Sequence, residues 1–99
     1  MRPIHVAQMD KARPVLVLTR ELVRPHLTRV TVAPITTTTR GLSTEVPCGT
    51  QNGLEMAGAI SCDNITTIAA SSLGRRIGHL LDSQEAELTA AIQAAFDLE

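Results

Sequence analysis

The stretch Ala12-Arg13-Pro14-Val15-Leu16-Val17-Leu18-Thr19 decides how this chain folds. Its four consecutive branched aliphatic residues stand between polar ones, in a run too short for an ordinary helix. Such a run predicts a strand, at residues 15–19, that is buried on both faces. Proline cannot donate to a sheet ladder, and it biases the residue before it towards an extended conformation. We therefore expect Arg13 to project from the beginning of this strand, at an edge of the sheet.

A second strand is predicted at residues 28–35, where five of eight side chains are β-branched. Four threonines, beginning with Thr36, follow it. If the two strands pair, Thr36 lies beside Arg13. Arginine with hydroxyl donors, and with no acid beside them, favours a phosphate ligand over a core position. We interpret Arg13 and Thr36 as a phosphodiester site, with ordinary strand propensity in a solvated turn as the alternative for the later threonines.

The rest of the chain predicts more short strands and one helix. The strands are expected at residues 4–9, 42–48, 58–62, 65–68 and 75–81. Asp82 with Glu85 resembles a capping box that starts a helix, which runs to about Leu98. Its apolar stripe consists of Leu88, Ala91, Ile92, Ala95 and Phe96. Residues 20–27 are expected to form a loop with one helical turn, because Pro25 interrupts them.

Length and composition predict one globular domain over residues 1–99, with a barrel at 1–81 and the helix at 82–98. Hydrophobic residues make up 43% and charged residues 19%, which excludes a disordered chain. Phe96 is the only aromatic residue. A binding surface built on aromatic stacking is therefore not expected, either for bases or for a peptide.

Charge is distributed unevenly along the chain. Residues 1–76 contain nine basic and five acidic residues, a net charge of +4, whereas residues 77–99 contain five acids and no base. Eight of the nine basic residues are arginine, which favours forked contacts to phosphate or carboxylate. A compositional bias of the genome is the alternative explanation. The pattern predicts an anionic partner for the strand-rich part and none for the tail.

The cysteines and histidines provide only weak candidates for catalysis. Cys48 and Cys62 lack the spacing of a metal site, so no metal or cofactor is expected. Cys62 with His79 is a conceivable nucleophile pair, but a cysteine in a strand of small residues is more often inert. His5 is similarly more consistent with a half-exposed strand position than with catalysis. No signal peptide or long apolar segment is visible, which predicts a cytoplasmic protein with reduced thiols and no membrane contact.

The order of these pieces resembles the MazF/PemK (Kid) family of bacterial toxin ribonucleases. The similarity is strongest in residues 13–18, in Ala33-Pro34-Ile35-Thr36 and in Cys62-Asp63-Asn64-Ile65-Thr66-Thr67-Ile68. It implies a small, strongly bent Src-homology-3-like barrel with a C-terminal helix. It also implies a homodimer that cleaves single-stranded RNA without a metal and is neutralised by a small MazE-like antitoxin.

The resemblance also assigns roles to residues. Arg13 would handle protons and the charge that develops on the phosphorane, and Thr36 would be its hydroxyl partner at the phosphate. Asp63 would help to bind RNA, although from the residues alone a turn-forming pair is the first interpretation of Asp63-Asn64 and a base or ligand contact the alternative. The expected RNA-binding residues are Thr37, Arg40, Asp63, Asn64 and Arg20.

Two other functions remain open on the sequence. The related CcdB group uses the same scaffold for a non-enzymatic toxin that inhibits a topoisomerase. A small barrel that binds a peptide is the second alternative, and the lack of aromatic residues argues against it. Cleavage itself needs no external nucleophile, because the 2′-hydroxyl of RNA can attack the neighbouring phosphate. The expected products carry a 2′,3′-cyclic phosphate and a 5′-hydroxyl.

Overall fold

A computed structural model describes residues 1–98 of the chain. Glu99, which the sequence analysis places at the end of the single domain and counts among the acids of the tail, lies outside the described residues. The strands are β1 (Pro3–Gln8), β2 (Ala12–Val17), β3 (Arg29–Thr36), β4 (Glu45–Cys48), β5 (Gly58–Ser61), β6 (Thr66–Ala69) and β7 (Leu73–His79). The α-helix is α1 (Glu85–Ala95), and the 3₁₀ turns are η1 (Arg24–His26), η2 (Thr50–Asn52), η3 (Cys62–Asn64), η4 (Ala70–Ser72) and η5 (Asp82–Gln84).

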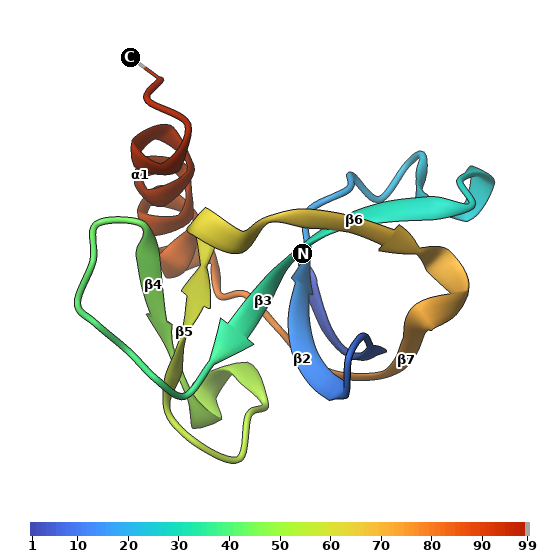
Figure 1. Ribbon diagram of the computed structural model, residues 1–99, viewed down its shortest axis with the longest axis horizontal. Coiled ribbons are helices and arrows are strands. Elements are labelled where there is room, and N and C mark those ends of the chain that lie inside the picture. Colours follow the sequence, from blue (N-terminus) through green and yellow to red (C-terminus); the bar gives the residue numbers. More distant parts are fainter. Residues whose placement is uncertain (99) are drawn as a thin grey trace.

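All strand pairs in the described residues are antiparallel, in the order β4-β5-β3-β2-β1-β7, with β6 also paired to β3. The turn η4 joins β6 to β7, so β3, β2, β1, β7 and β6 form a closed ring of strands (Figure 1). The long strand β3 belongs to two parts of the sheet. Residues 29–32 of β3 pair with β6, residues 32–34 pair with β2, and its last two residues, Ile35 and Thr36, pair with β5.

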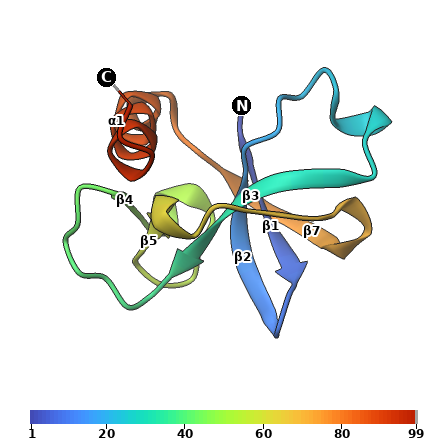
Figure 2. The same ribbon diagram turned by 45° about the horizontal axis from the view of Figure 1, so that its top comes forward.

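The two faces of β2 are buried in different hydrophobic clusters, as the aliphatic run predicts. Val15 and Val17 pack with Val30 and Val32 of β3 inside the ring of strands. Leu16 belongs to a larger cluster that also contains residues of β4, β5 and α1. All three β2 side chains are at most 1% exposed. The helix lies beside β4 and β5 and covers this second cluster (Figure 2).

The predicted strands are present, but their ends differ. β2 begins at Ala12 and ends at Val17, two or three residues earlier than expected, and Pro14 lies inside the ladder opposite Val6. Proline is tolerated there because β2 pairs with β1 alone at this point; its pairing with β3 starts only at Val15. Arg13 is therefore at a sheet edge, as expected, although it is within the strand.

The start and the end of α1 correct the sequence prediction. Asp82 and Glu85 do not form a capping box: Asp82 begins η5, and Glu85 pairs with Arg2 at 3.1 Å. Gln84 caps η5, because its Oε1 accepts a hydrogen bond of 2.9 Å from the Leu81 amide, and it is followed by α1, which has no side-chain cap of its own within residues 1–98. The helix ends at Ala95 and not near Leu98, so Phe96 is 55% exposed and not part of the apolar stripe.

A buried polar network holds the start of the helix against the barrel. Asn52 is 1% exposed and donates hydrogen bonds to the His79 carbonyl at 3.1 Å and to Gln84 Oε1 at 2.6 Å. Gln84 in turn donates to the Pro47 carbonyl at 3.1 Å. A Cβ atom at Gly78 would lie 1.7 Å from the Asn52 carbonyl oxygen, so only glycine allows this approach of η2 to β7.

No helix within residues 1–98 is both long and apolar enough to cross a membrane.

Candidate active site

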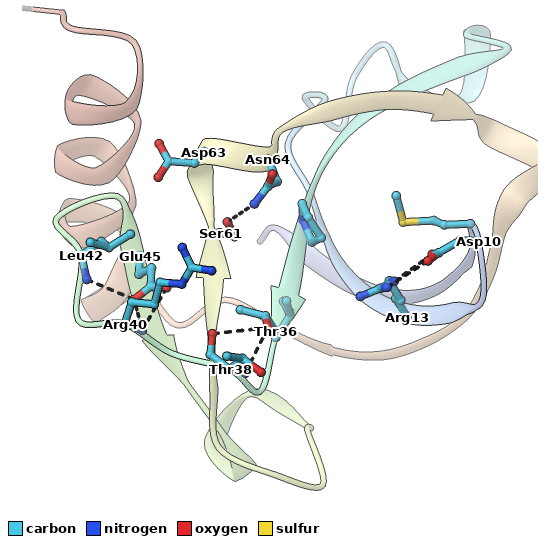
Figure 3. Close-up of a pocket in the computed structure, with 13 residues that line it drawn as sticks. Asp10, Arg13, Thr36, Thr38, Arg40, Leu42, Glu45, Ser61, Asp63 and Asn64 are labelled. Carbon is cyan, nitrogen blue, oxygen red and sulfur yellow. Dashed lines mark hydrogen bonds and ion pairs between the residues drawn. The ribbon is translucent and has the colours of Figure 1, made fainter.

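A cleft of about 650 Å³ opens where β3 leaves β2. The β2–β3 pairing includes Val15 with Pro34, and continuing that register by two residues would place Arg13 opposite Thr36. Instead Thr36 pairs with Ala59 of β5. The two strands therefore separate at this point, and Arg13 and Thr36 line the cleft from its two walls (Figure 3). The predicted pair is present, but as facing groups across a cleft and not as neighbours in a ladder.

An acid does lie beside Arg13, contrary to the sequence analysis. Asp10 Oδ1 accepts a hydrogen bond of 2.9 Å from Arg13 Nε, and Asp10 Oδ2 accepts one of 3.0 Å from Nη2. The tight turn between β1 and β2 brings the two residues together, because they are only three positions apart. Arg13 lowers the pKa of Asp10 from 3.8 to about 2, and the carboxylate raises the pKa of Arg13. The guanidinium is thus oriented and fixed in its charged form.

Thr36 is held at the end of β3 by its own turn. Its Oγ1 accepts a hydrogen bond of 3.0 Å from the amide of Thr38. This bond closes a short turn in which the threonine side chain replaces a backbone acceptor. Thr36 and Thr38 both line the cleft. The hydroxyl in turn donates a longer hydrogen bond of 3.5 Å to the Thr38 carbonyl, so its position is fixed and a ligand acceptor can replace that weak contact.

Glu45 organises the wall of the cleft that lies opposite the β1–β2 turn. Its Oε1 accepts hydrogen bonds of 3.1 Å from the backbone amides of Arg40 and Leu42. These bonds fold the loop between β3 and β4 and place Arg40 over the cleft (Figure 3). Sequence analysis missed Glu45; an acid that follows a short polar loop and precedes a strand is the signal that indicates it.

Asp63, Asn64 and Ser61 complete the lining. Asp63 Oδ2 accepts a hydrogen bond of 2.6 Å from Thr44, and Asn64 donates one of 2.8 Å to Ser61. Both Asp63 and Asn64 belong to η3 and remain exposed. The turn and the ligand-contact interpretations are therefore compatible: the residues form a turn that faces the cleft.

Two predicted RNA contacts lie outside this cleft. Thr37 lines a second groove, which also includes Arg13 and Thr36. Arg20 lines a separate hollow of about 230 Å³ with Val17 and Thr19, beyond the far end of β2. The reason is geometric: Arg13 is near the start of β2, which rises about 3.3 Å per residue, and Arg20 follows the other end of that strand. Arg20 is not brought together with Arg13, Thr36, Arg40, Asp63 and Asn64.

The charge of the cleft also differs from the expected basic site. Asp10, Glu45 and Asp63 line it together with only two cations, Arg13 and Arg40. All three carboxylates accept hydrogen bonds from protein donors. In the part of the chain that the structure describes, no group of three or more His, Cys, Asp and Glu side chains is arranged to hold a metal ion.

The alternative nucleophiles are unsuitable. Cys62 is 1% exposed inside the larger hydrophobic cluster, where burial and then the nearby Asp63 raise the pKa of its thiol. Burial likewise raises the pKa of Cys48 to about 11. A thiolate is thus disfavoured at both positions, and the interpretation of Cys62 as an inert core residue holds. His5 is half-buried in β1, and its Nδ1 is 2.9 Å from the Gly74 carbonyl oxygen.

Residues 2–96 match the model of a family described as "PemK-like, MazF-like toxin of type II toxin-antitoxin system". The chain belongs to this family. The expected fold class, a Src-homology-3-like barrel with a C-terminal helix, is thereby confirmed together with the resemblance noted from the sequence.

Individual relatives agree with this assignment. Endoribonuclease MazF3 of Mycobacterium tuberculosis is 67% identical over 99 residues, which cover all of this chain and 96% of that protein. Probable endoribonuclease MazF5 of the same species is 35% identical over 86 residues, which cover 86% of this chain and 79% of that protein. The solved structure of Mycobacterium tuberculosis toxin MazF-mt6 has a TM-score of 0.97 at 66% identity and covers 99% of both chains.

Proposed function

We propose that this toxin is a sequence-specific endoribonuclease that cleaves single-stranded RNA without a metal ion. The observation that carries the proposal is the separation of β2 and β3, which places Arg13 and Thr36 on facing walls of one cleft. The identity of 67% with an endoribonuclease over the whole chain supports it. Inhibition of a topoisomerase is not favoured, because the relatives described above are named endoribonucleases.

The reaction requires an aligned 2′-hydroxyl and a stabilised anionic transition state. The 2′-oxygen attacks the adjacent phosphorus as its proton leaves, and the bond between phosphorus and the 5′-oxygen breaks as that oxygen gains a proton. The products carry a 2′,3′-cyclic phosphate and a 5′-hydroxyl.

Arg13 serves this reaction as a cation and not as a base. Two of its five N–H groups are bound by Asp10, and the other three have no hydrogen-bond partner among residues 1–98. These three groups stabilise charge on the non-bridging phosphate oxygens. Since Asp10 raises the pKa of Arg13, loss of its proton becomes harder. The Thr36 hydroxyl donates a hydrogen bond to the same phosphate from the opposite wall. The nucleotides beside that phosphate contact Asp63, Asn64 and Arg40.

The family description supports a second protein as partner. We propose that a small MazE-like antitoxin occupies the cleft and that the toxin acts as a cytoplasmic homodimer. An antitoxin segment that covers Arg13 would compete directly with RNA. Addition of the cognate antitoxin should therefore reduce RNA binding as well as cleavage.

The decisive experiment maps cleavage on chemically modified RNA. Purified toxin is incubated with mixed RNA in EDTA, and the new ends are sequenced. An oligonucleotide around the mapped site is then prepared with one deoxyribose 5′ of the scissile phosphate. We expect cleavage of the unmodified strand in EDTA and none of the modified strand. Cleavage of the deoxy strand, a 5′-phosphate on the product, or a requirement for a divalent ion would refute the mechanism.

A further inference from the structure

A second groove, of about 550 Å³, adjoins the cleft. Both are lined by Arg13, Ile35, Thr36 and Thr38, so the two hollows meet along the proposed catalytic pair. Lys11 and Arg75 also line the groove. A strand of RNA whose scissile phosphate lies at Arg13 and Thr36 can therefore continue from one hollow into the other.

A bulge in β7 directs Arg75 into this groove. β1 pairs Ala7 with Leu73, His5 with Arg76 and Ile4 with Gly78, so the register shifts twice. Gly74 and Arg75 stand opposite the one residue between Ala7 and His5, and Ile77 is skipped between the next two pairs. Cross-strand partners share a face of the sheet, which puts Arg76 on the face of His5. Arg75 then shares the other face with Ile77, and both of them line the groove. Bulges next to active sites commonly redirect a side chain in this way.

Lys11 and Arg75 differ from Arg13, which lines both hollows and is paired with Asp10. Within residues 1–98, the ion pairs join Arg2 to Glu85 and Arg13 to Asp10. Neither the Lys11 ammonium nor the Arg75 guanidinium makes a hydrogen bond to another described residue, and both residues are exposed. An anion that binds them therefore displaces no protein partner.

The two hollows carry opposite charge. The cleft has three carboxylates and two arginines, whereas the groove has Lys11, Arg13 and Arg75 with Glu55 as its single acid. Carboxylates repel phosphate but accept hydrogen bonds from the amino groups of bases. The cleft therefore suits base edges around one phosphate, and the groove suits the backbone.

We propose that the groove is a second phosphate subsite, in which Lys11 and Arg75 hold a phosphate that flanks the scissile one. This inference rests on the ribonuclease function proposed above. The apolar floor of the groove, which includes Val6, Leu54 and Ile77, gives the adjoining sugar or base a surface to pack on. Contacts to phosphate fix register and affinity and carry no sequence information. The subsite should thus set how tightly the toxin binds RNA and not where it cuts.

The test compares Arg75→Gln with Arg76→Gln, which remove the same charge from adjacent residues on opposite faces of β7. Each variant is titrated with the deoxy-substituted oligonucleotide at several salt concentrations. A phosphate contact on a single strand contributes about −0.7 to the slope of log affinity against log salt. Because Lys11 and Arg75 hold one phosphate, we expect the double variant Lys11→Gln/Arg75→Gln to make the slope shallower by about 0.7. Arg75→Gln alone should make the slope shallower by part of that amount, Arg75→Lys should restore it, and Arg76→Gln should leave it unchanged.

A shortened substrate identifies the phosphate. The oligonucleotide is trimmed one nucleotide at a time from each end. Trimming that removes the flanking phosphate should weaken binding to the unmodified toxin and to Arg76→Gln but not to Lys11→Gln/Arg75→Gln, because that double variant has already lost the contact and the two losses are then not additive. The sequenced cut site should be the same in all variants. If the unmodified toxin cleaves RNA but Arg75→Gln and Arg76→Gln have equal salt slopes, the phosphate subsite is refuted and the ribonuclease function is not. Failure of the unmodified toxin to cleave RNA would instead overturn the proposed function, and the subsite with it.

Discussion

Asp10 binds one edge of the Arg13 guanidinium through two hydrogen bonds, of 2.9 and 3.0 Å, and the Nη1 group has no partner among residues 1–98. The carboxylate therefore acts on Arg13 in two opposing ways. It orients the cation towards the cleft, and it reduces the attraction of that cation for phosphate. Kinetic constants can separate the orienting effect of Asp10 from its effect on the attraction for phosphate.

Replacing Asp10 by alanine should lower kcat and also lower KM. The guanidinium loses its fixed orientation, which weakens stabilisation of the transition state, while the cleft loses one of its negative charges. Steady-state kinetics on the mapped oligonucleotide measure both constants. Glu55→Ala is the control, because it removes a carboxylate from the groove without touching Arg13. A rise in KM with unchanged kcat would contradict the orienting role.

The ion pair should persist to low pH. Because the pKa of Asp10 in the folded chain is about 2, below the ordinary 3.8, its contribution to stability is present above pH 3.8 and is lost as the pH falls towards 2. Titration of the Asp10 carboxyl by NMR should give a midpoint near 2. In Arg13→Ala the midpoint should return towards 3.8, because the hydrogen bond to Arg13 is the largest cause of the shift. An unchanged midpoint would show that the pair does not form in solution.

Substitutions on the two walls of the cleft should differ in strength. Arg13→Ala removes a charged donor to the phosphate and should reduce kcat at least about 100-fold. Thr36→Ala removes one neutral hydrogen bond, about 1 kcal/mol or roughly fivefold, and Thr36→Ser should recover most of it. Circular dichroism should show an unchanged fold, because Arg13 stands at a sheet edge. Near-full activity in Arg13→Lys would contradict a forked contact to phosphate.

Neither cysteine should react while the chain is folded. Cys48 and Cys62 are buried, and the pKa of each thiol is raised, to about 11 for Cys48. N-Ethylmaleimide at pH 7.5 should modify them only after urea is added, as followed by mass spectrometry. Cys62→Ala should keep the cut site and most of the activity. If Cys62→Ala were folded but inactive, the Cys62 thiol would have to be reconsidered as the nucleophile.

The polar network at the start of α1 should matter to stability and not to cleavage. Gln84→Ala leaves the buried Asn52 amide without its shortest hydrogen bond, which should lower the free energy of unfolding by about 1–3 kcal/mol. Gln93→Ala on the exposed part of the same helix is the matched control. Urea denaturation compares the two variants. Equal midpoints would mean that the network contributes nothing net.

The elements that sequence analysis predicts best are those with a strong local signal. The β-branched run before Thr36 and the aliphatic run after Pro14 both form strands, because their side chains fill a core on one or both faces. Strand ends and the helix cap are less well predicted. Asp82 has the character of a cap, but it begins a 3₁₀ turn, and the buried Gln84 caps that turn and immediately precedes α1.

The site is only partly visible in the sequence because it depends on where strands separate. Arg13 and Thr36 are detectable by their position next to strands, but the exchange of β2 for β5 as the partner of β3 is a tertiary event. Asp10 has a local signal, an acid three residues before an arginine across a tight turn, that was not used. Arg20 lines a separate hollow, so its contact with RNA stays a prediction that is independent of the cleft.

The burial of β2 on both faces has a consequence for how the molecule opens. A strand that is buried in only one cluster can detach while the rest of the fold persists. β2 cannot, because Leu16 anchors it in the cluster under α1 and Val15 and Val17 anchor it inside the ring of strands. Its backbone amides should exchange with deuterated solvent only through global unfolding, and so more slowly than those of the exposed strand β6. The strand that bears Arg13 would then keep its place while the loops around the cleft fluctuate to admit RNA.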